Sequence, residues 1–125
     1  MKEIYIIRHA ESISNAGEVT IRHDIMPLSE LGQKQAKELA ERLEVEPDLI
    51  VVSEYSRTRE TADPFISKNP HVPVETWNQV HEFTHLNPDI YDGTTKNDRA
   101  SHAIDYWENA DIHFSHGNGA ESFAE

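Results

Sequence analysis

The hydrophobic pattern along the chain alternates between short apolar runs and stretches with helical spacing. Apolar residues follow one another without alternation at 4–7 and 49–52, which is typical of strands buried on both faces and predicts a first strand over 3–8 and a second over 49–52. A third, shorter strand is expected over about 72–77. Strands separated by helical segments of roughly 10–15 residues indicate βαβ units and a parallel sheet. We therefore expect residues 1–125 to form a single α/β domain with a mostly parallel sheet.

Three helices are expected between and after these strands. The first spans about 29–43, because Ser29 suits an N-cap and the following apolar residues recur at helical spacing. The second spans about 57–67, where Pro64 is expected to kink or end it, since proline lacks a backbone donor. The third is expected over about 94–109. The predicted buried faces are Ala36, Leu39, Ala40 and Leu43 in the first helix and Ala100, Ala103, Ile104 and Trp107 in the third.

The composition is that of a globular protein, because 37% of the 125 residues are apolar and 27% are charged. No apolar run approaches the roughly 18 residues of a membrane span, and no basic and apolar leader precedes the first strand. Cysteine is absent, which excludes disulfides and thiolate chemistry, and we expect a cytoplasmic protein. The net charge of -12 argues against nucleic-acid binding, because that function needs a basic face to neutralise phosphates.

Candidate catalytic side chains follow the predicted strands at their carboxyl ends. Arg8 and His9 end the first strand. Arg57 comes shortly after the second strand, and Glu82 follows the third. The carboxyl ends of parallel strands lie at one edge of a sheet, so these side chains are expected to meet there. Guanidinium groups bind phosphate oxygens in a planar fork, a neutral imidazole can attack phosphorus, and a carboxylic acid can protonate the leaving oxygen. The set therefore predicts phosphoryl transfer.

Four stretches of the chain together resemble one known family. Residues 8–12 read RHAES and, with Asn15, resemble the signature of the histidine phosphatase superfamily in its phosphoglycerate-mutase-like branch. Three further stretches are similar to the family's motifs in order and spacing: LSELGQKQA at 28–36, SEYSRTRETA at 53–62 and GAESF at 119–123. Because the similar stretches are spread along the whole chain, chance is a poor explanation for them.

The resemblance implies a three-layer α/β/α sandwich and a reaction that needs no metal or other cofactor. It implies that His9 attacks a small-molecule phosphate monoester and forms a phosphohistidine. Arg8 and Arg57 would clamp the phosphate, and Asn15 would touch the phosphate or the rest of the substrate. Glu82 would donate the proton to the leaving group. Hydrolysis is favoured over mutase chemistry, because a mutase must shield its intermediate from water with closing segments.

The family also has a second catalytic histidine, in a His-Gly pair after the segment that 119–123 resembles. The chain ends before that point, and the pair at 116–117 precedes the segment, so we interpret it as part of a loop. The chain is therefore expected to be truncated and to correspond to the first two-thirds of such a domain. A missing central strand would leave an apolar sheet edge, which predicts a homodimer, a swapped assembly or low stability. Activity is expected to be low or absent unless something replaces the histidine.

Two alternatives remain open from the sequence. The chain is also compatible with a degenerate domain that binds a phosphorylated ligand through Arg8 and Arg57 without turnover. Residues 81–85 read HEFTH and match the H-E-x-x-H pattern of zinc hydrolases. That pattern needs both histidines on one helical face, whereas Pro88 follows three residues later and the preceding residues favour a strand or loop. The zinc alternative is therefore disfavoured.

Overall fold

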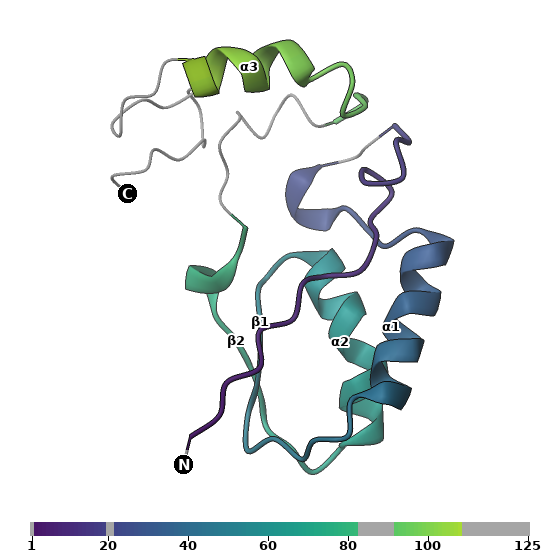
Figure 1. The fold of residues 1–125 in the computed structure, drawn as a ribbon, viewed down its shortest axis with the longest axis vertical. Coiled ribbons are helices and arrows are strands. Elements are labelled where there is room, and N and C mark those ends of the chain that lie inside the picture. Colours follow the sequence, from purple (N-terminus) through teal and green to yellow (C-terminus); the bar gives the residue numbers. More distant parts are fainter. Residues whose placement is uncertain (1, 20–21, 83–91, 109–125) are drawn as a thin grey trace.

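The computed structural model describes residues 2–19, 22–82 and 92–108 (Figure 1). No helix in these ranges is long and apolar enough to cross a membrane. In chain order the elements are the 3-10 helix η1 (His23–Ile25), helix α1 (Glu30–Arg42), strand β1 (Ile50–Val52), helix α2 (Ser56–Lys68), strand β2 (Val74–Thr76), the 3-10 helix η2 (Asn78–Val80) and helix α3 (Ala100–Glu108).

Strands β1 and β2 lie side by side in parallel, and α2 connects them. The register pairs Ile50 with Val74 and Val52 with Thr76. Just beyond the strands, the backbone amide of Trp77 donates a hydrogen bond to the Val52 carbonyl at 2.9 Å. A strand–helix–strand unit with parallel strands is the predicted architecture, so the α/β class is confirmed.

Helices α1 and α2 pack against each other and form one layer beside the strands (Figure 1). α1 begins after Ser29, whose side-chain oxygen accepts a hydrogen bond from the Gly32 amide at 3.1 Å, as predicted for an N-cap. Its predicted apolar face is buried at Ala36 and Ala40 and half-buried at Leu39 and Leu43. The apolar core of the described residues consists of Met26, Leu28, Ala36, Ala40, Val52, Tyr55, Phe65 and Val72.

Helix α2 continues past Pro64 and ends only at Lys68, so proline does not end it as the sequence suggested. The neighbouring Phe65 side chain is buried, which anchors the last turn to the core. Asn69 closes the helix, because its backbone amide and its side-chain Nδ2 donate to the Phe65 carbonyl at 3.1 and 2.9 Å. These contacts compensate for the one backbone donor that proline lacks.

The predicted first strand is not formed. Residues 2–11 contain no helix or strand, and the described sheet consists of β1 and β2 alone. Ile4 is 87% exposed and Ile6 is 94% exposed, so the expected burial of this run is wrong as well. An apolar run has the side chains of a buried strand, but it becomes one only where a neighbouring strand supplies the backbone ladder. Neither β1 nor β2 pairs with residues 3–8.

The third helix begins later than predicted. The expected start at 94–95 is part of a turn instead. Thr95 N donates to Asp98 Oδ2 at 2.8 Å, and Asp98 N donates to Thr95 Oγ1 at 3.3 Å. This reciprocal pairing has the form of a capping box, and α3 proper follows it from Ala100.

The predicted burial of α3 is wrong for Ala100, Ile104 and Trp107, whose side chains are exposed. Helical spacing gathers apolar residues on one side of a helix, but their burial requires a surface to pack against. The segments at 116–117 and 119–123, on which part of the family resemblance depends, lie outside the described residues.

Candidate active site

Helices α1 and α2 both hold the backbone that follows His9. The Ala10 amide donates to Thr61 Oγ1 at 3.0 Å, and this hydroxyl in turn donates to the Arg57 carbonyl at 2.7 Å. The Glu11 amide donates to the Gln35 side-chain oxygen at 2.9 Å. The segment thus keeps a defined position without belonging to a strand.

The N-terminus of α1 approaches this segment very closely. Ser29 Oγ donates to Glu11 Oε1 at 2.7 Å while it accepts from the Gly32 amide, and the Ser29 amide donates to the Glu11 carbonyl at 2.9 Å. A Cβ atom on Gly32 would lie 2.0 Å from that carbonyl oxygen. Only glycine allows such an approach, so the LSELGQKQA stretch at 28–36 forms the support on which the Glu11 backbone rests.

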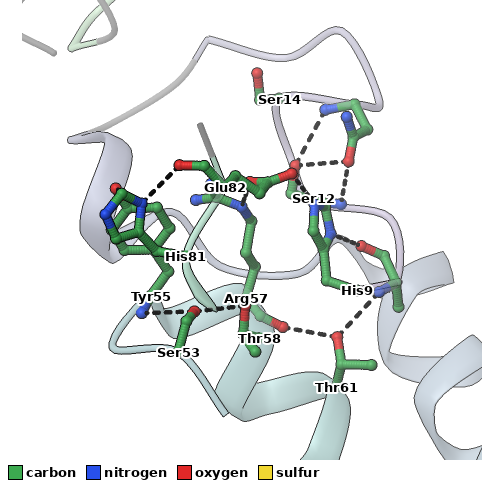
Figure 2. A network of polar contacts seen from close by, with 12 residues as sticks. His9, Ser12, Ser14, Ser53, Tyr55, Arg57, Thr58, Thr61, His81 and Glu82 are labelled. Atoms are coloured by element: carbon green, nitrogen blue, oxygen red, sulfur yellow. Dashed lines mark hydrogen bonds and ion pairs between the residues drawn. The ribbon is translucent and has the colours of Figure 1, made fainter. Parts of the chain in front are cut away.

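One carboxylate connects the predicted nucleophile and the predicted phosphate ligand (Figure 2). Glu82 Oε1 lies 2.9 Å from His9 Nε2, and Glu82 Oε2 accepts from Arg57 Nε at 2.7 Å and also from Arg57 Nη2. The side chains of His9 and Arg57 are only 7% and 3% exposed, whereas that of Glu82 is 47% exposed. The structure therefore brings together three of the predicted site residues, from segments as far as 73 positions apart.

The partners of the His9 ring require both of its nitrogens to donate. Nδ1 lies 2.6 Å from the Ala10 carbonyl, which can only accept. The hydrogen bond from His9 lowers the pKa of the Glu82 carboxyl most strongly, and the hydrogen bond and charge of Arg57 lower it further against the effect of desolvation, from 4.5 to about 2. Glu82 is thus an ionised acceptor that faces Nε2 of the His9 ring.

Tyr55 supports the Arg57 side chain, a role that the sequence analysis did not assign. The Arg57 guanidinium carbon lies 4.8 Å above the centre of the Tyr55 ring, within the range of a cation–π interaction. The Tyr55 amide donates to Ser53 Oγ at 3.3 Å, and Ser53 Oγ donates to Thr58 Oγ1 at 2.9 Å. An aromatic residue two positions before Arg57 was the available signal, but only the turn into α2 places its ring against the guanidinium.

Arg8 and Asn15 do not take part in the ion-paired cluster of His9, Arg57 and Glu82. Arg8 is exposed, and none of the contacts described for the cluster involves it. Asn15 Oδ1 instead accepts from the amide and the hydroxyl of Ser12, at 3.2 and 3.0 Å, and so stabilises the turn after the predicted nucleophile. The structure brings neither of them to the cluster, so their predicted contacts with the phosphate stay predictions.

The two described residues of the H-E-x-x-H pattern, His81 and Glu82, make contacts of their own within the protein. His81 Nδ1 donates to the Glu82 carbonyl at 2.7 Å, and the Glu82 side chain is committed to the ion pairs. His85 lies outside the described residues. Within the described ranges, no group of three or more His, Asp or Glu side chains is placed to hold a metal ion. The zinc alternative gains no support from this part of the chain.

Comparison with protein families matches this arrangement of motifs to one family. Residues 4–125 match the model of the Histidine phosphatase superfamily (branch 1). The chain belongs to the histidine phosphatase superfamily.

Named relatives of this histidine phosphatase chain include phosphatases and mutases. A probable phosphatase of Schizosaccharomyces pombe is 32% identical over 81 residues, which are 64% of this chain and 39% of the relative. A probable phosphoglycerate mutase, GpmB, of Photorhabdus laumondii is 38% identical over 64 residues, which are 50% of this chain and 30% of the relative. The matches thus span less than half of the length of either relative.

Solved structures share the fold. The alpha-ribazole phosphatase of Shigella flexneri superposes with a TM-score of 0.70 at 25% identity, covering 94% of this chain and 58% of that one. A mycobacterial glucosyl-3-phosphoglycerate phosphatase in complex with VO3 superposes with a TM-score of 0.64 at 27% identity, covering 86% of this chain and 51% of that one. The α/β histidine phosphatase fold predicted from the sequence is therefore confirmed.

Proposed function

We propose that the chain is the nucleophile-bearing part of a phosphatase that hydrolyses a small-molecule phosphate monoester through a phosphohistidine on His9. The observation that carries this proposal is the cluster in which one carboxylate joins His9 Nε2 to the Arg57 guanidinium. An imidazole nucleophile, a planar phosphate ligand and a carboxyl group within hydrogen-bonding distance are the parts that phosphoryl transfer to histidine needs.

Glu82 occupies the donors that a phosphoryl group would use. Its two oxygens accept from the nucleophilic nitrogen of His9 and from the guanidinium of Arg57. A phosphate dianion offers more charge and more acceptor oxygens than a carboxylate, so it competes for the same guanidinium fork. Substrate binding therefore displaces Glu82 from Arg57, and the cluster without ligand is a resting state.

This displacement prepares both catalytic groups at once. Without Arg57, the carboxylate loses the hydrogen bonds and the positive charge of that guanidinium, which hold its pKa low, while desolvation still raises it. Glu82 then takes the Nε2 proton of His9. The neutral imidazole attacks phosphorus, the bond from phosphorus to the ester oxygen breaks, and Glu82 returns the proton to that leaving oxygen. Water attacks the phosphohistidine in the second step, with Glu82 as the base, and releases inorganic phosphate.

The remaining assignments extend this proposal. Arg8 and Asn15 contact the phosphate or the rest of the substrate once it has entered. Residues 1–125 act as one domain in the cytoplasm, form a homodimer and do not bind nucleic acid, since the net charge is -12. Hydrolysis is favoured over mutase chemistry.

A second candidate is a domain that binds a phosphorylated ligand without turnover. The arrangement without ligand favours it, because Nε2 of His9 is engaged by Glu82 there. The two candidates share the phosphate site and differ only in whether His9 becomes phosphorylated.

The deciding experiment follows His9 itself. The protein is mixed with p-nitrophenyl phosphate, quenched in base at short times, and weighed intact by mass spectrometry. We expect a transient gain of one phosphoryl group in the wild type and in His71→Ala, which changes an exposed histidine outside the cluster, and no gain in His9→Ala. Phosphate binding without an adduct would favour the non-enzymatic candidate. A folded wild type with neither an adduct nor phosphate binding would overturn the proposed function.

A further inference from the structure

A buried arginine joins two distant segments beside the proposed active site. Arg99 is only 5% exposed. Its Nη1 donates to the carbonyl and the hydroxyl of Thr94, at 3.1 and 2.8 Å, and its Nη2 donates to Ser14 Oγ at 2.9 Å. One planar guanidinium thus holds its own turn together and ties that turn to a residue 85 positions away.

A second basic side chain makes the same connection. Lys96 Nζ donates to the Asn15 carbonyl at 3.2 Å. Residues 94–99, which immediately precede α3, are therefore attached to the turn at 12–17 by two adjacent contacts. Only eleven Lys and Arg residues occur in the chain, and two of them meet this one turn.

The turn at 12–17 has a fixed shape of its own. The Ala16 amide donates to the Ser12 carbonyl at 3.0 Å, and the Asn15 amide donates to Ser12 Oγ at 3.2 Å. Ser12 lies only three residues after His9, and Figure 2 draws Ser12 and Ser14 in one close-up with His9 and Glu82. The turn is therefore the first structured segment after the proposed nucleophile.

We propose that Arg99 is a positioning residue that fixes residues 94–99 as the wall against which the ester's leaving group lies. This inference rests on the proposed phosphate site, but it concerns the part of the substrate beyond the phosphoryl group. Arg57 and His9 would hold the phosphoryl group, and Arg99 touches neither of them in the described contacts. Removing Arg99 should therefore weaken binding of the organic part of a ligand and spare binding of phosphate itself.

The test compares two probes that need no turnover: inorganic phosphate and 1-naphthylmethylphosphonate, measured by calorimetry. We expect Arg99→Ala to raise the dissociation constant of the phosphonate about tenfold, because residues 94–99 lose the side chain that attaches them to Ser14. The dissociation constant of phosphate should change less than about twofold. Ser14→Ala removes a single acceptor of Arg99. It should raise the dissociation constant of the phosphonate by a smaller factor and again spare that of phosphate, so it replaces Arg99→Ala if that variant does not fold. Arg59→Ala is the matched control, because Arg59 is an exposed arginine paired with Asp63 within α2.

Amide hydrogen exchange provides a second readout that does not depend on any ligand. We expect exchange at 12–17 and 94–99 to accelerate in Arg99→Ala and not in Arg59→Ala. Equal weakening of both probes, or unchanged exchange and affinity in folded Arg99→Ala, would overturn the role of Arg99. A wild type that binds neither phosphate nor the phosphonate would overturn the proposed phosphate site together with this inference. Calorimetry of the wild type alone detects that outcome, before any variant is made.

Discussion

At the scale of single residues, Glu82 is the group whose state decides what the site can do. A carboxyl group with a pKa of about 2 is fully ionised near neutral pH and cannot donate a proton. It therefore stabilises the ligand-free cluster. In the proposed mechanism it becomes an acid only when a phosphate dianion takes over Arg57, so the same residue would have one role before substrate binds and another role afterwards.

This state has a consequence for stability at low pH. The folded-state pKa of Glu82 lies below its ordinary value, so the ion pairs contribute stability above about pH 4.5 and lose it as the pH falls toward 2. Because the Glu82 side chain is half exposed, screening limits this contribution to about 1 kcal/mol. We expect the free energy of unfolding, measured with urea at several pH values, to fall less steeply between pH 5 and 2 in Glu82→Gln than in the wild type.

Glu54→Gln is the control for this measurement. Glu54 is an exposed glutamate in the same stretch as Arg57, so the variant removes the same charge without touching the cluster. If Glu54→Gln and Glu82→Gln had the same pH profile, the ion pairs of Glu82 would contribute nothing to the folded state. Adding phosphate should also reduce the difference between Glu82→Gln and the wild type, since phosphate displaces the carboxylate.

At the scale of elements, the N-terminus of α1 positions the segment that carries the nucleophile. Ser29 caps the helix and binds Glu11, and Gly32 permits the Glu11 carbonyl to approach. An ordinary helix gains about 1 kcal/mol of stability when glycine is replaced by alanine. At Gly32 the added methyl group would meet a carbonyl oxygen, so the usual sign should be reversed.

We expect Gly32→Ala to lower the free energy of unfolding by about 1–3 kcal/mol, the typical cost of overpacking. Phosphate binding should weaken as well, because the segment that holds His9 must move. Chemical denaturation and phosphate calorimetry are the measurements. Gln33→Ala, at an exposed position of the same helix turn, is the control and should leave both quantities nearly unchanged. A Gly32→Ala variant as stable as the wild type would show that the close approach is not needed.

The elements that the sequence predicted correctly are those whose local signals and tertiary partners agree. α1 has its serine cap and its alanine face, and β1 and β2 are separated by one helix, so each finds its partner within a short stretch of chain. Residues 3–8 and α3 were predicted from the same kinds of pattern, but their burial depends on surfaces distant in sequence. An apolar pattern reports what a segment is able to bury and contains no information on whether a partner is present.

The same distinction applies within the site. The sequence predicted that His9, Arg57 and Glu82 would meet at one edge of the sheet. The three side chains do meet, although residues 3–8 form no strand before His9. That Glu82 bridges the other two could not be predicted, because it depends on side-chain geometry across 73 residues. Tyr55 and Arg99 were missed for a similar reason, since an aromatic ring under a guanidinium and a buried guanidinium on a serine leave no spacing signal in the sequence.

At the scale of the whole molecule, the chain has a strongly acidic net charge, and its described part exposes an apolar run. Ile4 and Ile6 are almost fully exposed in a segment whose sequence favours strand formation. Such a segment, which pairs with neither β1 nor β2, is a template for pairing with another chain. The net charge of -12 opposes that association through long-range repulsion, which salt screens.

These two forces predict an association that strengthens with ionic strength. We expect sedimentation velocity to show a higher fraction of homodimer in 0.5 M NaCl than in 0.05 M NaCl at equal protein concentration. The added salt shortens the range of charge repulsion from about 14 Å to about 4 Å and leaves apolar pairing intact. Ile6→Lys should remain monomeric in both, since it places a charge in the middle of the pairing segment. Leu31→Lys, an equally charged change at an exposed leucine on α1, should dimerise like the wild type. Equal dimerisation of both lysine variants would mean that residues 4–7 are not the contact, and that the homodimer, if it forms, uses another face.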